Sequence, residues 1–417
     1  MRGHLEKFGD TFISASWLTQ ERLLRWGITA VLVSLTLLAA DALAHLTHGV
    51  TNAAGEQLSR DFINYWSGAK LAMTGQALQA YDRSAFHLYQ QTLVGPASEF
   101  KIYGYPPVLM LLCRPLAMLP YVPALMLWVV GGISLAALPL AALVGWRNAL
   151  IALVGAPAAF WNLFAGQTGH FTAALLGGGL LLLERRPTIA GILFGLLGCK
   201  PQLGLLLPLA LACGGYRRAF VSATATVLTL VAVSALLLGP EIWPAFAQQM
   251  AVQDRLMEAG TSFWPRMPTV FAALRLLGAG NPTAYALQVL SALLAAGIVG
   301  VLWRSGCAFA VKSAALIVGA FLATPYAWDY DMIALLFAAA WLGVEARHTG
   351  FLSFERTSVL VLLILPALIV LPVRTLNLQI GPLLLWLPMI VLARRGIARA
   401  LPAPAIGNAA ISAMSRA

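Results

Sequence analysis

Long apolar runs separated by short polar breaks dominate the chain from about residue 26 to residue 393. A helix that crosses a membrane needs about 20 consecutive apolar residues. The pattern therefore predicts an all-α polytopic membrane protein, with about 12 transmembrane helices in one membrane domain over residues 26–395. Residues 1–25 form a short N-terminal segment, and the tail 396–417, rich in Ala, Pro and Ser, is expected to be disordered.

Composition supports a membrane protein over a soluble one. Of the 417 residues, 60% are hydrophobic and 10% charged, and the mean hydropathy is +0.80, whereas about 25% of the residues in a soluble globular chain are charged. The net charge of +11 comes with no basic stripe interleaved with aromatic residues, so we expect no nucleic-acid partner.

Basic residues instead gather in short clusters between apolar runs, as in cytoplasmic loops. The clusters are the N-terminal segment, "ERRP" (184–187), "GYRRAF" (215–220), "WRSG" with Lys312, "EARH" to Arg356, and "ARRGIAR" near the C-terminus. This orientation predicts cytoplasmic termini in an integral plasma (inner) membrane protein. The loops 48–104 and 240–281, the turn at "CKPQ" and the stretch "ATPYAWDYD" then lie on the external, periplasmic side.

One segment does not fit a simple count of crossings. Four apolar segments lie between Tyr105 and Glu184, where this orientation needs an odd number. Segment 105–120 begins with "YPP" and is interrupted at Arg114–Pro115, and broken backbone at membrane depth occurs where it is buried in protein or lines a cavity. We expect this segment to be re-entrant or interfacial.

The first external loop carries the stretch "RDFINYWSGAKLAMTGQALQAYD" (60–82). Apolar residues at helical spacing from Phe62 to Met73 predict an amphipathic helix that lies in the membrane interface. A second helix begins after Asp82 as its N-cap. Asp61 is a candidate general base toward a hydroxyl, or it caps the helix that it precedes.

Further polar residues are candidates for a site on the same face. "DYD" (329–331) is the pattern that holds a metal in many nucleotide-sugar enzymes, but nucleotide sugars are absent from this side, and Asp329 can also be a helix cap. Lys200, between two half-length apolar segments, suits a phosphate or is a snorkelling lysine. Gln167 and His170 line a polar cavity or cap a helix. We find no His or Cys spacing typical of a metal site, so no metal is expected.

Four stretches in order resemble glycosyltransferase family 87 over residues 55–345. They are the stretch 60–82, "YGYPPVLMLLCRPLAMLP", "NLFAGQTGHF" through "GCKPQLGLLLPLAL", and "TPYAWDYDMIALL". The resemblance implies a GT-C fold. It also implies a transferase that takes a sugar from a polyprenyl-phosphate donor, with mannose as the first candidate, and that uses no nucleotide, metal or other cofactor. The partners it implies are that donor, a lipid or glycan acceptor, and membrane lipid.

The resemblance also implies roles for residues of this chain. Asp61 matches the proposed general base, and Lys200 matches a contact to the donor phosphate. Arg266 and Arg114 are further candidates for holding the phosphate, because a leaving phosphate needs countercharge. A single displacement would invert the anomeric centre. We expect these residues to line the cavity or contact substrate: Gln167, His170, Gln202, Tyr326, Asp329, Asp331, Tyr65 and Trp66.

Three other functions remain open on the sequence. A transporter or flippase of lipid-linked sugars would also be polytopic, but it predicts two similar halves, and we see no internal repeat. A GT-C ligase of whole glycans would have larger external loops. A membrane scaffold without catalysis is the third.

Overall fold

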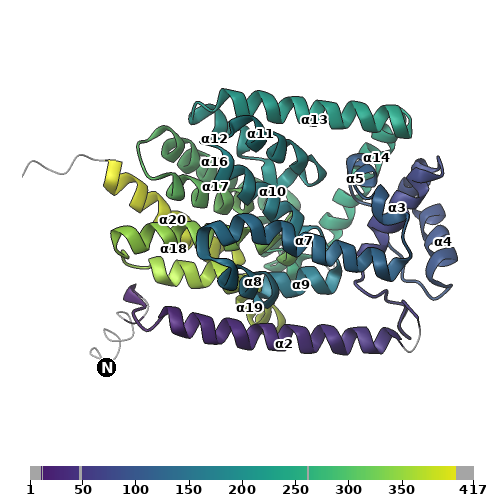
Figure 1. Ribbon diagram of the computed structural model, residues 1–417, viewed down its shortest axis with the longest axis horizontal. Helices are drawn as coiled ribbons and strands as arrows, with labels where there is room; N and C mark the ends of the chain where they lie inside the picture. Colours follow the sequence, from purple (N-terminus) through teal and green to yellow (C-terminus); the bar gives the residue numbers. More distant parts are fainter. Residues whose placement is uncertain (1–10, 12, 47–48, 261–262, 401–417) are drawn as a thin grey trace, which may run out of the picture.

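The computed structural model describes residues 11, 13–46, 49–260 and 263–400 (Figure 1). Within these residues the chain forms α-helices and short 3-10 helices, and no strand. This confirms the all-α prediction. Residues 401–417 of the predicted tail, and residues 1–10 and 12 of the segment 1–25, fall outside the described residues, although helix α20 extends to Ala400.

Six helices are long and apolar enough to cross a membrane. They are α2 (Gln20–Leu46), α7 (Tyr121–Val144), α13 (Arg217–Leu238), α16 (Asn281–Arg304), α19 (Glu355–Leu376) and α20 (Gly381–Ala400). A seventh candidate is a pair bent by 60°, formed by α8 (Trp146–Gly155) and α9 (Pro157–Ala165). The structure thus describes a multi-pass membrane protein with six or seven candidate spans, and the count of about 12 crossings stays a prediction.

Shorter apolar helices fill the space between these spans. They are α10 (Gly169–Leu182), α11 (Pro187–Leu196), α12 (Leu207–Cys213) and α17 (Phe309–Ala323). Helices α11 and α12 are the two predicted half-length segments, and they are joined through the 3-10 turns η2 (Leu197–Cys199) and η3 (Pro201–Gly204). Lys200 lies at the break between the turns, as the sequence predicts.

The hydrophobic core surrounds α17 and α18 (Ala334–Thr349). Of the 15 residues of α17, 12 are buried, and α18 is buried along most of its length. Both helices are rich in Ala, which lets α10, α16 and α19 pack closely around them. This buried pair is the scaffold on which the 3-10 turn η5 (Asp329–Ile333) is placed, directly between α17 and α18.

Segment 105–120 is broken, as expected for a segment that does not cross the membrane. It forms α5 (Pro107–Leu112) and α6 (Arg114–Ala117), which are 6 and 4 residues long. Helix α5 contacts η2, and Cys113 and Cys199 share one apolar cluster. Two breaks that are distant in the sequence, at Arg114–Pro115 and at Lys200–Pro201, therefore lie near each other.

The helix predicted after Asp61 is present, but its environment differs from the prediction. Helix α3 (Phe62–Met73) has ten of its twelve residues buried, so it is a core helix and not one that lies with a single face in the membrane interface. The reason is tertiary, because α5, α6 and α7 cover the faces that the sequence left unpartnered. Helix α4 (Arg83–Val94) is the exposed amphipathic helix, and Asp82 caps it by accepting from the N–H groups of Ser84 and Ala85 at 3.0 and 2.9 Å.

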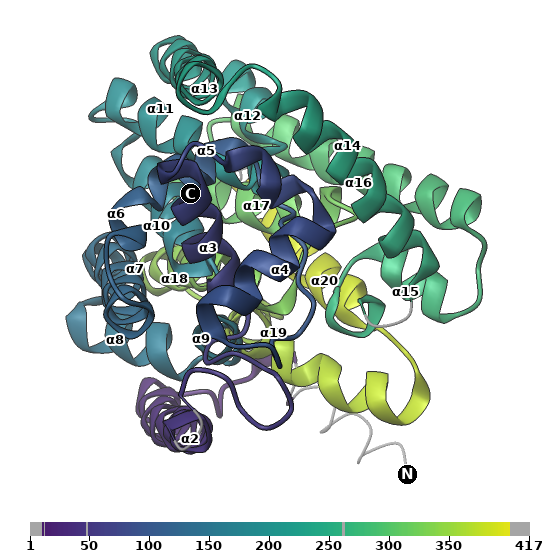
Figure 2. The same ribbon diagram turned by 90° about the vertical axis from the view of Figure 1, so that its right-hand side faces the viewer.

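Helices α3, α4 and α14 (Ile242–Ala259), from the predicted external segments 48–104 and 240–281, gather at one end of the molecule (Figures 1 and 2). The same two segments also contain η1 (Ala77–Tyr81), η4 (Trp264–Arg266) and α15 (Val270–Leu276). The loop 240–281 is thus largely helical. The start of α2 and the end of α20 lie at the opposite end (Figure 1), so the helices that follow the molecule's long axis separate these two regions.

Candidate active site

The turn between α9 and α10, residues 166–168, positions the site because it packs against two distant segments. Gly166 has φ +66°, and a Cβ there would lie 2.7 Å from the carbonyl oxygen of Ser59. A Cβ at Gly169 would lie 2.3 Å from the carbonyl oxygen of Tyr330. Only glycine permits both close approaches. The turn therefore brings the start of α3 and the turn η5 to either side of Gln167.

Asp61 lies at this junction and is held by its backbone and its side chain. Its N–H donates to the carbonyl of Ala165 at 2.8 Å. The carboxylate does not cap α3; instead Oδ2 accepts from Nε2 of Gln167 at 2.8 Å, and Oδ1 lies 3.7 Å from Nζ of Lys101. With 28% of the side chain exposed, Asp61 has an accessible carboxylate oxygen, and the helix-cap alternative is not supported.

Gln167 is fixed in orientation by its other bonds. Its Nε2 also donates to the hydroxyl of Tyr105 at 3.1 Å, and its Oε1 accepts from the hydroxyl of Tyr65. The rings of Tyr65 and Tyr105 pack with centroids 4.8 Å apart. Because both atoms of the amide have partners, the amide cannot turn away, and Nε2 is directed at Asp61. Tyr65 contributes to the site through Gln167.

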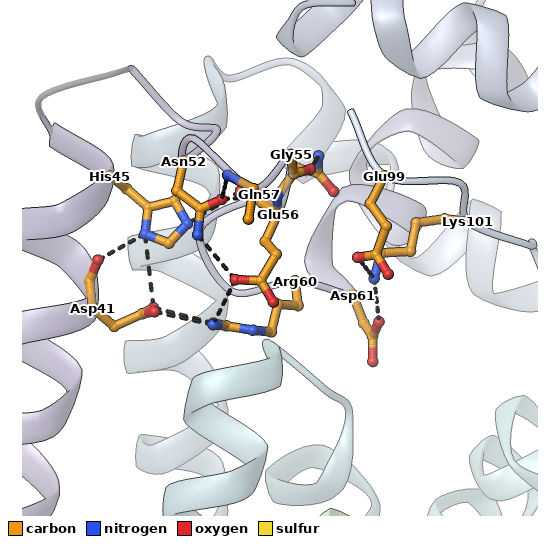
Figure 3. Close-up of polar contacts among 11 residues, drawn as sticks. Asp41, His45, Asn52, Gly55, Glu56, Gln57, Arg60, Asp61, Glu99 and Lys101 are labelled. Atoms are coloured by element: carbon orange, nitrogen blue, oxygen red, sulfur yellow. Dashed lines mark hydrogen bonds and ion pairs between the residues drawn. The ribbon is translucent and has the colours of Figure 1, made fainter. Parts of the chain in front are cut away.

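Lys101 is a site residue that the sequence reasoning missed. Its Nζ lies between two carboxylates, 2.7 Å from Oε2 of Glu99 and 3.7 Å from Oδ1 of Asp61 (Figure 3). Lys101 stands two residues before the motif that begins at Tyr103, and a cation directly before a motif was the available signal. The ammonium group thus adds a cation beside the Asp61 carboxylate.

Arg266 and Asp329 form a bidentate ion pair across the site. Nε and Nη2 of Arg266 donate to the two carboxylate oxygens of Asp329, each at 2.8 Å. The Asp329 side chain is 5% exposed and that of Arg266 is 38% exposed. Nη1 of Arg266 donates to none of the described residues, so one edge of the guanidinium can meet an anion.

The second ion pair of this motif is buried. Nζ of Lys200 donates to Oδ1 of Asp331, with side-chain exposures of 6% and 0%. Oδ2 of Asp331 accepts from the N–H of Trp328 at 3.1 Å. The ammonium group also lies 4.8 Å from the ring centroid of Tyr330. The two acids of "DYD" therefore fix two cations from distant segments, and Lys200 is not a snorkelling lysine.

Electrostatics connects the Arg266 pair to Asp61. Burial opposes the charge on Arg266, but the hydrogen bonds to Asp329 outweigh it and raise the pKa of Arg266, and the Asp61 carboxylate adds to the increase. The guanidinium also lies over the ring of Trp161, 4.9 Å from its centroid. Asp61 is therefore close enough in space to act on the charge of Arg266.

His170 stabilises the bend between α8 and α9. Pro157 has no N–H, so the carbonyl of Leu153, four residues earlier, has no partner within the helix. Nε2 of His170 lies 2.9 Å from that carbonyl oxygen, and Nδ1 lies 2.7 Å from the side-chain amide of Asn162. His170 is 2% exposed, so it acts here as a structural residue.

The other predicted site residues lie in different surroundings. Nε1 of Trp66 donates to the carbonyl of Leu119 at 3.0 Å, so Trp66 is part of the core beside α6. The hydroxyl of Tyr326 accepts from Nε2 of Gln253 at 3.4 Å. Gln202 is half-buried in η3, and Arg114 is exposed on α6. Among the described residues, neither Gln202 nor Arg114 forms a hydrogen bond or ion pair with the Asp61 carboxylate.

The described residues contain no group of three or more His, Cys, Asp or Glu side chains placed to hold a metal ion. The site instead consists of one accessible carboxylate, Asp61, with Lys101 on one side and the Arg266–Asp329 pair nearby. Such an arrangement can accept a proton from a hydroxyl and counter the charge of a phosphate in the same step.

Comparison with protein-family models identifies the family of the chain. The model of glycosyltransferase family 87 matches residues 103–325, which is more than half of the chain. The match includes the turn at Gln167, Lys200, Arg266 and Tyr105. Comparison with curated proteins and with solved structures gives no match. The GT-C fold therefore stays a prediction.

Proposed function

The chain belongs to glycosyltransferase family 87. On this premise we propose that it transfers a hexose from a polyprenyl-phosphate donor to a lipid or glycan acceptor, with mannose as the first candidate for the hexose. We place the reaction on the external face of the plasma membrane, without a metal or other cofactor and with inversion. Family membership indicates a glycosyltransferase, which leaves the transporter and the scaffold without support. A GT-C ligase stays the alternative within the same class.

The observation that carries the proposal is the asymmetry of the Asp61 carboxylate. Gln167 holds Oδ2 at 2.8 Å, while Oδ1 meets only the more distant ammonium of Lys101, at 3.7 Å, among the described residues. A general base needs one carboxylate oxygen free for the incoming hydroxyl and a fixed orientation for the other. Oδ1 has the first property, and Gln167 supplies the second.

The proposed step is a single displacement. The acceptor hydroxyl attacks the anomeric carbon, and its proton passes to Oδ1 of Asp61 as the new C–O bond forms. The bond between the anomeric carbon and the phosphate oxygen breaks, and the electron pair leaves with the polyprenyl phosphate. Attack opposite to the leaving group inverts the anomeric centre, so a β-linked donor gives an α-glycoside.

The cations have different roles in this proposal. The free edge of Arg266 meets the donor phosphate, since Asp329 holds the other edge of the guanidinium in place. Lys101 is the second cation of the site, because its Nζ lies 3.7 Å from Oδ1 of Asp61. Lys200 is buried against Asp331, so it acts by fixing the "DYD" turn, and direct contact with phosphate would require Asp331 to give up its bond.

The test is transfer of labelled sugar by purified protein in detergent. A panel of radiolabelled polyprenyl-phosphate sugars, starting with mannose, is incubated with host lipid extract and EDTA. Wild type should give a labelled product, Asp61→Asn should give none, and Asp82→Asn, the same change at the cap of α4, should behave as wild type. Equal activity of Asp61→Asn and wild type would contradict Asp61 as the base. Whole-glycan transfer from a diphosphate-linked donor would favour the ligase.

A further inference from the structure

A sizeable cavity of the described structure lies away from Asp61. It has a volume of about 620 Å³ and opens between the first half of α2 and the helices α8, α18 and α19. Asp61 follows the opposite end of α2. In Figure 1 this first half of α2 lies toward the end where the chain begins, and α3 and α4 lie at the other end. The cavity is therefore distinct from the candidate active site.

This cavity is a groove beside α2. It forms because α2 touches the rest of the protein along one narrow line. Gly27 of α2 lies against Ile151, where a Cβ would be 2.5 Å from Cγ2, and a Cβ at Gly155 of α8 would lie 3.0 Å from the carbonyl oxygen of Gly27. These glycines bring the two helix backbones together. Helix α2 packs on α8 and α9, and its flank toward α18 and α19 borders the groove.

The interior of the groove is apolar and open. Its walls include Leu23 and Ala30 of α2, Leu336 and Ala340 of α18, and Leu363 of α19. Gly343, also in the wall, has no atom within 4 Å of the position of an added Cβ. An apolar channel of this size in a membrane protein suits a hydrocarbon chain.

Three arginines line one end of the groove. Arg147 is in the first turn of α8, Arg347 is in the last turn of α18, and Arg356 is in the first turn of α19. Arg147 and Arg347 form no hydrogen bond or ion pair with the described residues. Arg356 donates to the carbonyl of Ser16 at 3.3 Å and lies over the ring of Phe351. None of the three is paired with a carboxylate in the described part of the chain.

The nearest acids of this region are already paired with another arginine. Arg395, 1% exposed, forms ion pairs with Glu355 and, at 3.6 Å, with Glu345. It also donates to Oγ1 of Thr349 at 2.6 Å. These bonds hold both carboxylates, so Arg347 and Arg356 on the same two helices have no carboxylate partner among the described residues.

We propose that this groove binds an anionic phospholipid, with the phosphate at Arg147, Arg347 and Arg356 and an acyl chain between α2 and α18. The apolar walls and the arginine-lined end are complementary to such a lipid and to neither a soluble anion nor a neutral lipid. The basic clusters predict that this end faces the cytoplasm, where anionic headgroups attract arginines. The bound lipid fills the gap beside α2 and holds that helix against the core.

The experiment measures the phospholipid that the full-length protein retains. Protein purified in mild detergent is exchanged into vesicles of phosphatidylglycerol and phosphatidylcholine in equal amounts, re-extracted, and analysed by native mass spectrometry. Wild type should retain phosphatidylglycerol at least tenfold over phosphatidylcholine. The double variant Arg347→Ala, Arg356→Ala should lose that preference, and Gly343→Leu should lower total bound lipid at least tenfold by filling the groove.

Two controls separate the groove from general effects. Arg304→Ala removes an exposed arginine at the end of α16, and Gly297→Leu adds a side chain where nothing lies within 4 Å; both should retain phosphatidylglycerol as wild type does. Equal retention by all variants would overturn the proposal, as would the absence of retained lipid in the wild type. Preferential capture of a polyprenyl phosphate added to the vesicles would overturn it as well.

Discussion

The side-chain amide of Gln167 donates to Oδ2 of Asp61 at 2.8 Å, across 106 residues of sequence. Glycines on both sides of Gln167 allow this contact, because they remove the Cβ atoms that would keep α3 and η5 away. The bond leaves Oδ1 of Asp61 as the carboxylate oxygen that can receive a proton.

Asp61 and Asp82 should separate catalysis from helix capping. Asp61→Asn should lower transfer at least 100-fold with little change in thermal stability, because its carboxylate makes no cap bond. Asp82→Ala should lose about 1 kcal/mol of stability and keep its activity, since it removes the cap of α4. Thermal melting in detergent and initial transfer rates measure both effects. A large loss of stability in Asp61→Asn would contradict the assignment.

Gln167 is a positioning residue, and the pH profile should report it. Gln167→Glu places a second carboxylate beside Asp61, and two adjacent carboxylates repel each other when both are charged. The base acts in its deprotonated form, so the acid limb of the kcat/KM profile should move to higher pH. Gln167→Met removes the bond without adding a charge and should lower kcat with a smaller shift. A profile that stays in place in Gln167→Glu would reduce Gln167 to a packing role.

Arg266 should govern the affinity for the donor. Arg266→Ala removes the free guanidinium edge and should raise the KM for the polyprenyl-phosphate sugar by about 10- to 100-fold, the worth of a charge-assisted hydrogen bond. Arg266→Lys keeps the positive charge but loses the two-pronged guanidinium, so its KM for the donor should lie between those of wild type and Arg266→Ala. The KM for the acceptor serves as the internal control. An unchanged donor KM in Arg266→Ala would exclude this contact.

Lys200 should contribute to the stability of the fold more than to donor binding. Lys200→Ala leaves Asp331 buried without its partner and should cost about 3–5 kcal/mol of stability. The double variant Lys200→Met, Asp331→Leu removes both charges and should recover most of that loss. Melting curves of the two variants decide between these outcomes. If Lys200→Ala is as stable as wild type and only its donor KM rises, Lys200 contacts the phosphate directly.

Two glycines of α10 offer a matched comparison. Gly169→Ala should lose about 1–3 kcal/mol, because the new Cβ would lie 2.3 Å from the carbonyl oxygen of Tyr330. Gly178→Ala, where the nearest atom is 3.6 Å away, should be neutral or gain about 0.5–1 kcal/mol. Melting temperatures measured side by side check the pair, and equal values for the two variants would mean that η5 yields to the added methyl group.

Local features of the sequence were enough to predict the membrane class, the helical content and the position of the breaks. Apolar run length and helix-breaking pairs such as Arg114–Pro115 and Lys200–Pro201 are local properties, and backbone hydrogen bonding in a bilayer leaves helices as the solution for such runs. The Asp82 cap is equally local, since its partners lie two and three residues away.

The pairing of the charged side chains depends on how distant segments of the chain pack together. The partners Asp61 and Gln167, Arg266 and Asp329, and Lys200 and Asp331 are separated by 106, 63 and 131 residues, and no periodicity predicts such contacts. For the same reason α3 carries an amphipathic pattern yet lies in the core. A local pattern states what a segment can bury, whereas the partner that covers it depends on how distant helices pack.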